Sequence, residues 1–488
     1  MIFAMNSPAR PQVRPLATAL LACALVVLAG CADMGKIEPQ SVAIKPLALN
    51  AGKAIADAGA DASVTWPTQA WWEALHDEQL NALVATAIAG SPNLRAAEAR
   101  VRQAESLAGV ARAGTLPKVD ASASIDRELY TANGAIPAAL AGKTAWKNTA
   151  MLSGSYDLDL WGRNRDLLAA ALDDVRMASA EAQMARLTLE TAIVRAYIQL
   201  SLDYTLQDSV AENLEQRHRI LEITRQRRAA GLATELEVAN IETTLPAGKR
   251  EHEQIGSSIA LLRNQLAALI GKGPGDGESI ARPQLTLQDG AGARVPATLP
   301  AELVGRRPDI VAQRWRVEAA GARIDSAKAD FYPNVNLAAF VGLQSLGFPR
   351  FLESHSKMAG VTPAISLPIF EGGRLRSQLG NQTALYDVAV EQYNGVVIQA
   401  MSDVANALVR IESVKQQDQL AQQALASARR QQQLAERAYK AGMTDSLNVI
   451  NAQLTLLNEQ QQMAQVASKQ LDNYALLMTA LGGGVKLD

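Results

Sequence analysis

The chain has 488 residues, with 47 Lys and Arg against 49 Asp and Glu, a formal net charge of −2, 48% hydrophobic residues and only 4% aromatic residues. The near-neutral charge argues against a nucleic-acid-binding protein that works through a broad basic surface, and 4 His with 2 Cys argue against zinc-ribbon, multi-haem and disulfide-scaffold proteins. Few aromatic residues among much Ala, Leu, Gln, Glu and Arg are typical of long packed helices.

The first thirty residues have the pattern of a secretory signal. Arg10 and Arg14 precede an apolar run that is shorter than the roughly 20 residues of a transmembrane helix. Cys31 directly follows Leu-Ala-Gly, which resembles the bacterial lipobox, where the thiol is acylated and the chain is cut before it. We expect a lipoprotein signal peptide over 1–30, a lipid on Cys31 and an extended tether over 31–65. An ordinary signal peptide that happens to contain a Cys is the alternative.

The rest of the chain contains the same series of landmarks twice, roughly 210 residues apart. The paired landmarks are 91–94 and 307–310, 116–119 and 332–335, 161–163 and 372–374, 230–231 and 441–442, and 269–271 and 480–482. Pairs in one order at a nearly constant spacing indicate a tandem duplication. We place the first repeat at 66–298 and the second at 299–488.

Each repeat is predicted to contain a medium helix, two strands and a hairpin of long helices. Gly231 and Gly442 mark the ends of the longest helices, where a positive φ is needed. Alternating four- and three-residue spacing of apolar residues, as in Ile255, Ile259 and Leu262, indicates coiled-coil packing. The predicted ranges are 92–114 and 308–330 for the medium helices, 117–131, 146–160, 333–346 and 357–370 for the strands, 163–271 and 374–481 for the helix hairpins, and 272–298 for an equatorial segment.

The predicted strands alternate apolar and polar residues. In the last strand, Val361, Pro363 and Ile365 share one parity, and Thr362 and Ala364 share the other. Such alternation over about ten residues is typical of a transmembrane β-strand, although a half-buried strand of a soluble sheet has the same period. Two duplicated strand hairpins in an exported chain favour the membrane. Because open sheet edges cannot face hydrocarbon, four strands would need other copies to close a barrel.

An ordered set of motifs then resembles a known family. The motifs are Trp-Trp-Glu-Ala-Leu at 71–75, Asp-Glu-Gln-Leu at 77–80, Leu-Pro-Ile-Phe-Glu-Gly-Gly-Arg at 367–374, Tyr-Lys-Ala-Gly at 439–442, Leu-Asn-Val-Ile-Asn-Ala at 447–452 and Leu-Gly-Gly-Gly at 481–484. Together they resemble the TolC/OprM-like outer membrane factors, in the NodT-type lipoprotein branch found with RND efflux pumps. The similarity covers about 66–484, which is nearly the whole chain after the predicted signal.

The resemblance implies a mixed α+β membrane protein. It would be a homotrimer whose twelve-stranded outer-membrane β-barrel continues into a coiled-coil α-helical tunnel in the periplasm, anchored to the membrane of a Gram-negative bacterium through Cys31. It would passively conduct small molecules as the exit duct of a tripartite pump, with a periplasmic adaptor and an inner-membrane RND-type transporter. No enzymatic activity, cofactor or nucleic acid is expected. A type I-like export duct, or a lipid-anchored coiled-coil scaffold without a pore, is the alternative.

The resemblance also places two functional regions at the far turns of the helix hairpins. The predicted adaptor-docking residues are Gly231, Leu232, Thr234, Gly442, Met443 and Thr444. The predicted periplasmic gate residues are Glu235, Glu237, Asn240, Asp445, Asn448 and Asn451.

Several relatives carry aspartate where this chain has Asn448 and Asn451, so the chain departs from the family pattern there. We expect Glu237 to supply an acidic ring instead, because clustered carboxylates repel one another and bind cations. The alternatives are helix capping by Thr234 and Asp445, and a solvated surface position for Glu237.

Catalytic and metal motifs are absent from the sequence. It contains no His-Glu-x-x-His, no Gly-x-Ser-x-Gly and no phosphate-binding Gly/Lys loop. The four His are far apart and share no ligand spacing. We therefore expect no metal site and no enzyme.

Overall fold

The computed structural model describes most of the chain as two compact units. The described residues are 34–45, 49, 60–61, 66–287, 295–296 and 299–485. The predicted signal peptide, Cys31 and most of the predicted tether lie outside them. The first unit combines 103–175 and 315–391 with 34–42, and the second combines 43–102, 176–314 and 392–485 where these are described. No described helix is both long and apolar enough to cross a bilayer.

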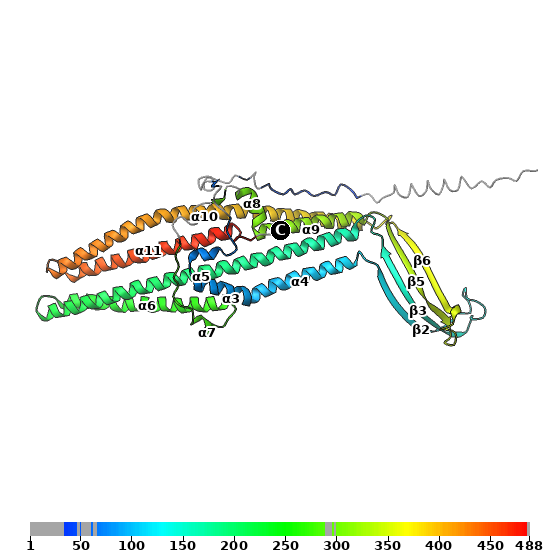
Figure 1. The fold of residues 1–488 in the computed structure, drawn as a ribbon, viewed down its shortest axis with the longest axis horizontal. Coiled ribbons are helices and arrows are strands. Elements are labelled where there is room, and N and C mark those ends of the chain that lie inside the picture. Colours follow the sequence, from blue (N-terminus) through cyan, green and yellow to red (C-terminus); the bar gives the residue numbers. More distant parts are fainter. Residues whose placement is uncertain are drawn as a thin grey trace, which may run out of the picture. The chain divides into compact units, whose positions relative to one another are not determined.

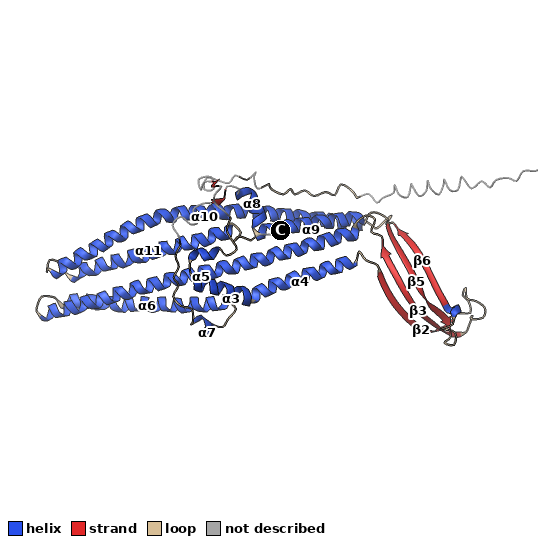
Figure 2. Cartoon of the chain, in the orientation of Figure 1, coloured by secondary structure: helices blue, strands red, loops and turns tan. Residues whose placement is uncertain are grey.

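The first unit contains one antiparallel sheet of four strands in the order β2-β3-β5-β6 (Figure 1). The strands are β2 (Lys118–Leu129), β3 (Thr144–Asp157), β5 (Asn334–Leu346) and β6 (Lys357–Ser366). Each predicted repeat contains one hairpin, and β3 pairs with β5 to join the two hairpins. The chain is otherwise mostly helical (Figure 2), as the composition predicts.

Three helices of the first repeat have counterparts of equal length in the second. They are α4 (Pro92–Ala113) and α9 (Pro308–Ala329) with 22 residues, α5 (Arg163–Ala229) and α10 (Arg374–Lys440) with 67, and α6 (Glu235–Leu269) and α11 (Ser446–Ala480) with 35. A tandem duplication predicts such equal lengths. Within the second unit, α5 lies beside α6 and α10 beside α11 as antiparallel hairpins (Figure 1).

The remaining elements are short. They are β1 (Ala60–Asp61), η2 (Trp71–Leu75), α3 (Glu78–Gly90), α7 (Pro274–Gly277), β4 (Val295–Pro296), α8 (Leu299–Arg306) and η3 (Ser354–Ser356). The predicted equatorial segment contributes α7 and β4, and β4 pairs in parallel with β1. Part of that segment lies outside the described residues.

Two strands end earlier than their alternation predicts. β3 ends at Asp157 because Asp159 adopts a φ of 44°, and its carboxylate oxygens accept hydrogen bonds from the backbone N–H groups of Asn164 and Arg165, each at 3.0 Å. These bonds cap the start of α5 and turn the chain out of the sheet. β6 ends at Ser366, two positions before a proline that has no N–H for the ladder.

The Trp-Trp motif belongs to the main hydrophobic core of the second unit. Trp71, Trp72 and Leu75 are buried against α3, α5, α6 and α11. Asp77 caps α3 by accepting the N–H of Leu80 at 2.9 Å, and it also accepts the hydroxyl of Tyr197 at 3.1 Å. Burial raises the pKa of Tyr197, so its hydroxyl remains a donor. The motif thus attaches residues 71–77, which precede α3, to α5.

Candidate functional site

The strand register places most of the apolar residues of the four strands on one face of the sheet, although Met151, Phe340 and Met358 lie on the other face. Ala121 pairs with Leu152, Leu152 pairs with Val341, and Val341 pairs with Ala359. The side chains on this face are exposed, with Leu152 at 48% and Val341 at 56%. Ser153, the neighbour of Leu152, lies on the other face with most of the polar residues, because side chains alternate along a strand. The sheet therefore presents an exposed apolar face.

Aromatic side chains lie near both ends of this sheet. Near the loops that join the strands of each hairpin, the ring centres of Trp146 and Phe348 are 5.8 Å apart. Near the ends that continue into helices, Trp161 stacks on Tyr332 at 4.7 Å, and its indole N–H donates to the carbonyl of Pro333 at 2.8 Å. An apolar band with aromatic residues at both borders is typical of β-sheets in outer membranes.

The two outer strands of the sheet have one partner each among the described residues. β2 pairs only with β3, and β6 pairs only with β5. Pro363, which the sequence leaves unexplained, lies in β6 and pairs with Leu337. An edge strand tolerates a residue without an N–H. The backbone groups of both edges are available to further strands.

The two hairpin turns of the second unit have the same geometry. Gly231 and Gly442 have φ of 75° and 72°. In each turn the next residue, Leu232 or Met443, donates its N–H back to a carbonyl five residues earlier, at 2.7 and 2.9 Å. This is the hydrogen bond of a Schellman cap, which favours glycine. Leu232 is 69% and Met443 is 80% exposed, so each turn presents an apolar side chain.

Both turns lead into a capped helix. The backbone N–H of Glu237 donates to the Thr234 hydroxyl at 3.3 Å, and the N–H of Thr234 donates to the Glu237 carboxylate at 3.1 Å, which completes a capping box. Asp445 accepts the N–H of Asn448 at 3.1 Å. The capping roles expected for Thr234 and Asp445 are confirmed. Glu237 has a structural role, and its carboxylate is half-buried.

The other predicted gate residues are exposed near the starts of α6 and α11. Glu235 forms an ion pair with Arg228 at 2.5 Å. The side-chain amide of Asn448 donates to the Thr444 hydroxyl at 2.8 Å and to Asp445 at 2.9 Å. Asn240 and Asn451 are exposed on their helices. Within one chain these residues satisfy local caps and ion pairs, and do not form a single cluster.

A buried contact that the sequence did not reveal joins α5 to α10 near the turns. The hydroxyls of Thr224 and Tyr439 are 2.9 Å apart. The guanidinium of Arg227 lies 4.6 Å from the ring centre of Tyr439 and donates to its carbonyl at 3.1 Å. The sequence signal for this contact is the Tyr-Lys-Ala-Gly motif, to which Tyr439 belongs. The contact holds the two hairpins of the protomer together close to their tips.

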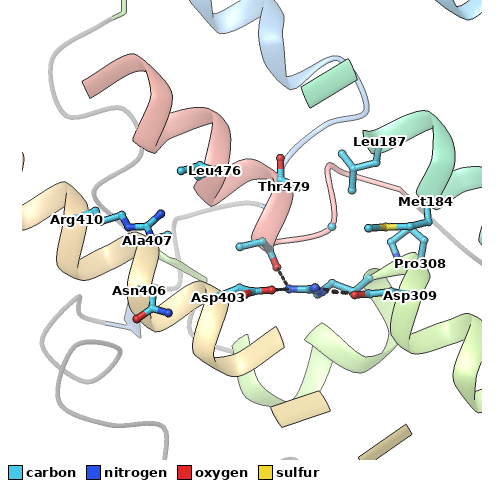
Figure 3. Close-up of a pocket in the computed structure, with 13 residues that line it drawn as sticks. Met184, Leu187, Pro308, Asp309, Asp403, Asn406, Ala407, Arg410, Leu476 and Thr479 are labelled. Atoms are coloured by element: carbon cyan, nitrogen blue, oxygen red, sulfur yellow. Dashed lines mark hydrogen bonds and ion pairs between the residues drawn. The ribbon is translucent and has the colours of Figure 1, made fainter. Parts of the chain in front are cut away.

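A second unforeseen cluster surrounds Arg307, which precedes α9 and lines a cavity of about 270 Å³ (Figure 3). Its side chain is 9% exposed and pairs with Asp309 at 2.7 Å and Asp403 of α10 at 3.0 Å. It also donates to the carbonyl of Ala480, at the end of α11, at 3.3 Å. Burial lowers the pKa of Arg307, but the two carboxylates outweigh it, so the pKa is raised and the charge is kept.

The described residues offer no cluster for chemistry on a substrate. Within them, no three His, Cys, Asp or Glu side chains come together in a way that would hold a metal ion. The cavity beside Arg307 is lined by an ion pair that is already satisfied, together with apolar side chains such as Leu187 and Leu476. The arrangement ties together α9, α10 and α11.

Comparisons with known proteins agree with this geometry. The family model described as "Outer membrane efflux protein" matches residues 83–272 and 299–483. The chain is 45% identical over 383 residues to the fusaric acid resistance protein FusA of Burkholderia cepacia, covering 78% of this chain and 71% of FusA. It is 32% identical over 481 residues to the multidrug resistance outer membrane protein MdtP of Escherichia coli K12, covering 95% and 96% of the two chains.

Solved structures give the same relationship. The outer membrane protein VceC from Vibrio cholerae superposes with a TM-score of 0.81 and 34% sequence identity, over 86% of this chain and 100% of VceC. The outer-membrane channel OprN superposes with a TM-score of 0.81 and 26% identity, over 93% and 98% of the two chains.

Proposed function

The chain belongs to the outer membrane efflux protein family, whose members are channels and not enzymes, and from that premise we propose that three copies form the exit duct of a tripartite pump. The duct passively conducts small molecules that an inner-membrane RND-type transporter delivers through a periplasmic adaptor. The names of FusA and MdtP, a fusaric acid resistance and a multidrug resistance protein, support small-molecule cargo over type I protein secretion.

The observation that carries the proposal is the exposed apolar face of a sheet with two open edges. In hydrocarbon, unpaired backbone groups at a sheet edge each cost several kcal/mol, so a spanning sheet must close. Four strands are too few for known barrels, which begin near eight strands. Pairing β6 of one copy with β2 of the next closes the wall, and three copies supply twelve strands.

The hairpin turns are proposed to dock the adaptor. Both turns present an exposed apolar residue, Leu232 or Met443, directly after a glycine whose Cβ position has no neighbouring atom within 4 Å. An exposed apolar side chain in a turn of small residues is suited to a pocket on a partner. Thr444 directly follows Met443, and Thr234 lies two residues after Leu232.

We expect Gly442→Arg to lower cross-linking to the adaptor about tenfold, the equivalent of ~1.4 kcal/mol, and to abolish drug efflux in cells. The bulky cation would occupy the surface on which the adaptor sits. Cross-link yield in intact cells and the minimum inhibitory drug concentration measure these effects.

Gly442→Asn is the matched control. Asparagine tolerates the left-handed conformation, and no described atom lies within 4 Å of the Cβ position at 442. It should keep most of the cross-linking. Equal efflux with Gly442→Arg and with the unaltered chain would rule out docking at this turn.

We also propose that Glu237 forms an acidic ring of three carboxylates at the periplasmic gate, helped by Glu235 and Asp445. The effect of the Glu237 charge can be tested without losing the helix cap, because a glutamine at the same position also completes a capping box. Glu237→Gln should lower the preference for cations in single-channel recordings by about tenfold, with an unchanged melting temperature. Glu237→Ala should alter both quantities. If Glu237→Gln leaves ion selectivity as it was, the acid is only a cap.

The lipid on Cys31 is part of the proposal. The Leu-Ala-Gly-Cys sequence supports it, and it would anchor the periplasmic side of the duct to the inner leaflet of the outer membrane. A single acyl chain binds membranes only marginally, whereas two or more anchor stably. The barrel and the lipid together would hold the protein in one membrane.

A further inference from the structure

Residues 34–45 form a strap that runs along α10. The carboxylate of Asp387 accepts the backbone N–H groups of both Gln40 and Ser41, each at 2.9 Å. The side-chain carbonyl of Asn394 accepts the N–H of Ile44 at 2.8 Å. These partners are about 350 residues apart in sequence, so the contacts are specific to the fold.

The two hydrogen-bonded positions on α10 have the same spacing as the two positions on the strap that they bind. Asp387 and Asn394 lie two helical turns apart, which is roughly 10.5 Å along a helix. Ser41 and Ile44 are three residues apart, which is roughly 10 Å along an extended chain. The strap therefore follows α10 in one register, and shifting it by one residue would break the hydrogen bonds.

The earlier part of the strap packs on an apolar cluster of the first unit. Met34 and Ile37 contact a cluster that includes Phe331 at the end of α9, and Leu375 and Leu379 at the start of α10. Since three residues separate Met34 from Cys31, their Cα atoms are at most about 11 Å apart. The register of the strap thus keeps the expected lipid attachment point close to the start of α10.

A pocket with a partly apolar lining lies in the same place. Phe331 and Leu375, which belong to the cluster beneath Met34, also line a cavity of about 210 Å³ together with Ile369 and Phe370. Ile369 is 83% and Phe370 is 89% exposed, and they are among the most exposed large apolar side chains of the described residues. Nothing else in the described chain covers them.

From this juxtaposition we propose that the pocket lined by Phe331, Ile369, Phe370 and Leu375 receives one of the acyl chains carried by Cys31, and that Asp387 and Asn394 position the strap so that this chain reaches the pocket. The inference rests on the proposed lipidation. The occupant is a fatty acyl chain covalently linked to this chain, because the short distance from Met34 to Cys31 brings it there and Phe331, Ile369, Phe370 and Leu375 give the pocket an apolar side. Glu371, Arg374 and Arg376 also line the pocket, and Arg374 and Glu371 form an ion pair with each other. The other acyl chains remain free to anchor the protein in the inner leaflet.

Photo-crosslinking in cells tests this site. Cells expressing the full chain are fed a palmitate analogue with a diazirine and an alkyne, and outer membranes are irradiated before peptide mass spectrometry. We expect the main adduct within 368–376. Asp387→Ala should lower that adduct several-fold, and Asp387→Asn should retain it, because its side-chain carbonyl can still accept the two N–H groups.

Further variants distinguish the effect of the pocket lining from the effect of the strap. Ile369→Ser with Phe370→Ser should lower the adduct with the strap intact. Phe348→Ser, which changes a 53% exposed aromatic residue at the other end of the sheet, should not. Cys31→Ser removes the label and sets the background.

The two possible failures are distinguishable. A wild-type chain that takes up no analogue would overturn the lipidation and the pocket together. Uptake with adducts that avoid 368–376, or that are unaffected by Asp387→Ala, would overturn the pocket alone.

Discussion

Leu152→Arg is expected to destabilise the membrane-embedded protein by about 2–4 kcal/mol per protomer, because a cation near the middle of a lipid-facing strand loses its hydration. Leu152 lies on the apolar face between Ala121 and Val341, away from both aromatic ends. With three copies in one barrel the effect is repeated, and we expect little folded protein in the outer membrane. Membrane fractionation and the heat-dependent mobility of the oligomer in detergent measure it.

Ser153→Arg is the matched control for this substitution. Ser153 is the next residue of β3 and lies on the opposite face, where the proposed barrel has its water-filled lumen. We expect normal assembly with altered conductance. Equal losses with both substitutions would mean that neither face meets lipid, as in the scaffold alternative.

Arg307→Ala is expected to lower the free energy of unfolding by about 3 kcal/mol. Removing one partner of a buried ion pair costs roughly 3–5 kcal/mol because the remaining charges are left uncompensated. The lower end applies because Asp309 and Asp403 are 23% and 35% exposed and can be partly hydrated. The loss of helical circular dichroism in guanidinium, followed on the detergent-solubilised protein, measures the change.

Arg410→Ala serves as the comparison. Arg410 lies on α10 and lines the same cavity, but it has no ion-pair partner among the described residues (Figure 3). An exposed substitution of this kind usually changes stability by less than about 0.5 kcal/mol. If both alanine variants are equally stable, the Arg307 cluster does not hold α9, α10 and α11 together.

The strands and helices could be predicted because their signals are local. Alternation in each strand gave the parity of its side chains, and the observed register places residues such as Val341 and Val361 on one face. Gly231 and Gly442 mark the hairpin turns in the sequence, because few residues other than glycine adopt the positive φ that these turns need. The strand ends were less predictable, because Asp159 stops β3 through side-chain caps that alternation does not encode.

The contacts that organise the candidate sites depend on tertiary structure. Thr224 and Tyr439 are 215 residues apart, and Arg307 and Ala480 are 173 apart. Nothing local in the sequence marks either pair, and Arg307 stands out there only as part of a repeated landmark. Glu237 shows the opposite case, since the Thr-x-x-Glu spacing of a capping box was already readable and gives the residue a role that does not need a gate.

The central claim is that the four-stranded sheet closes only with two other copies. Native mass spectrometry of the full chain, extracted from outer membranes in detergent, measures this most directly. We predict a species with the mass of three chains that persists after the detergent is removed by collisional activation. A monomer as the only species, under conditions where the sheet remains folded, would contradict the account.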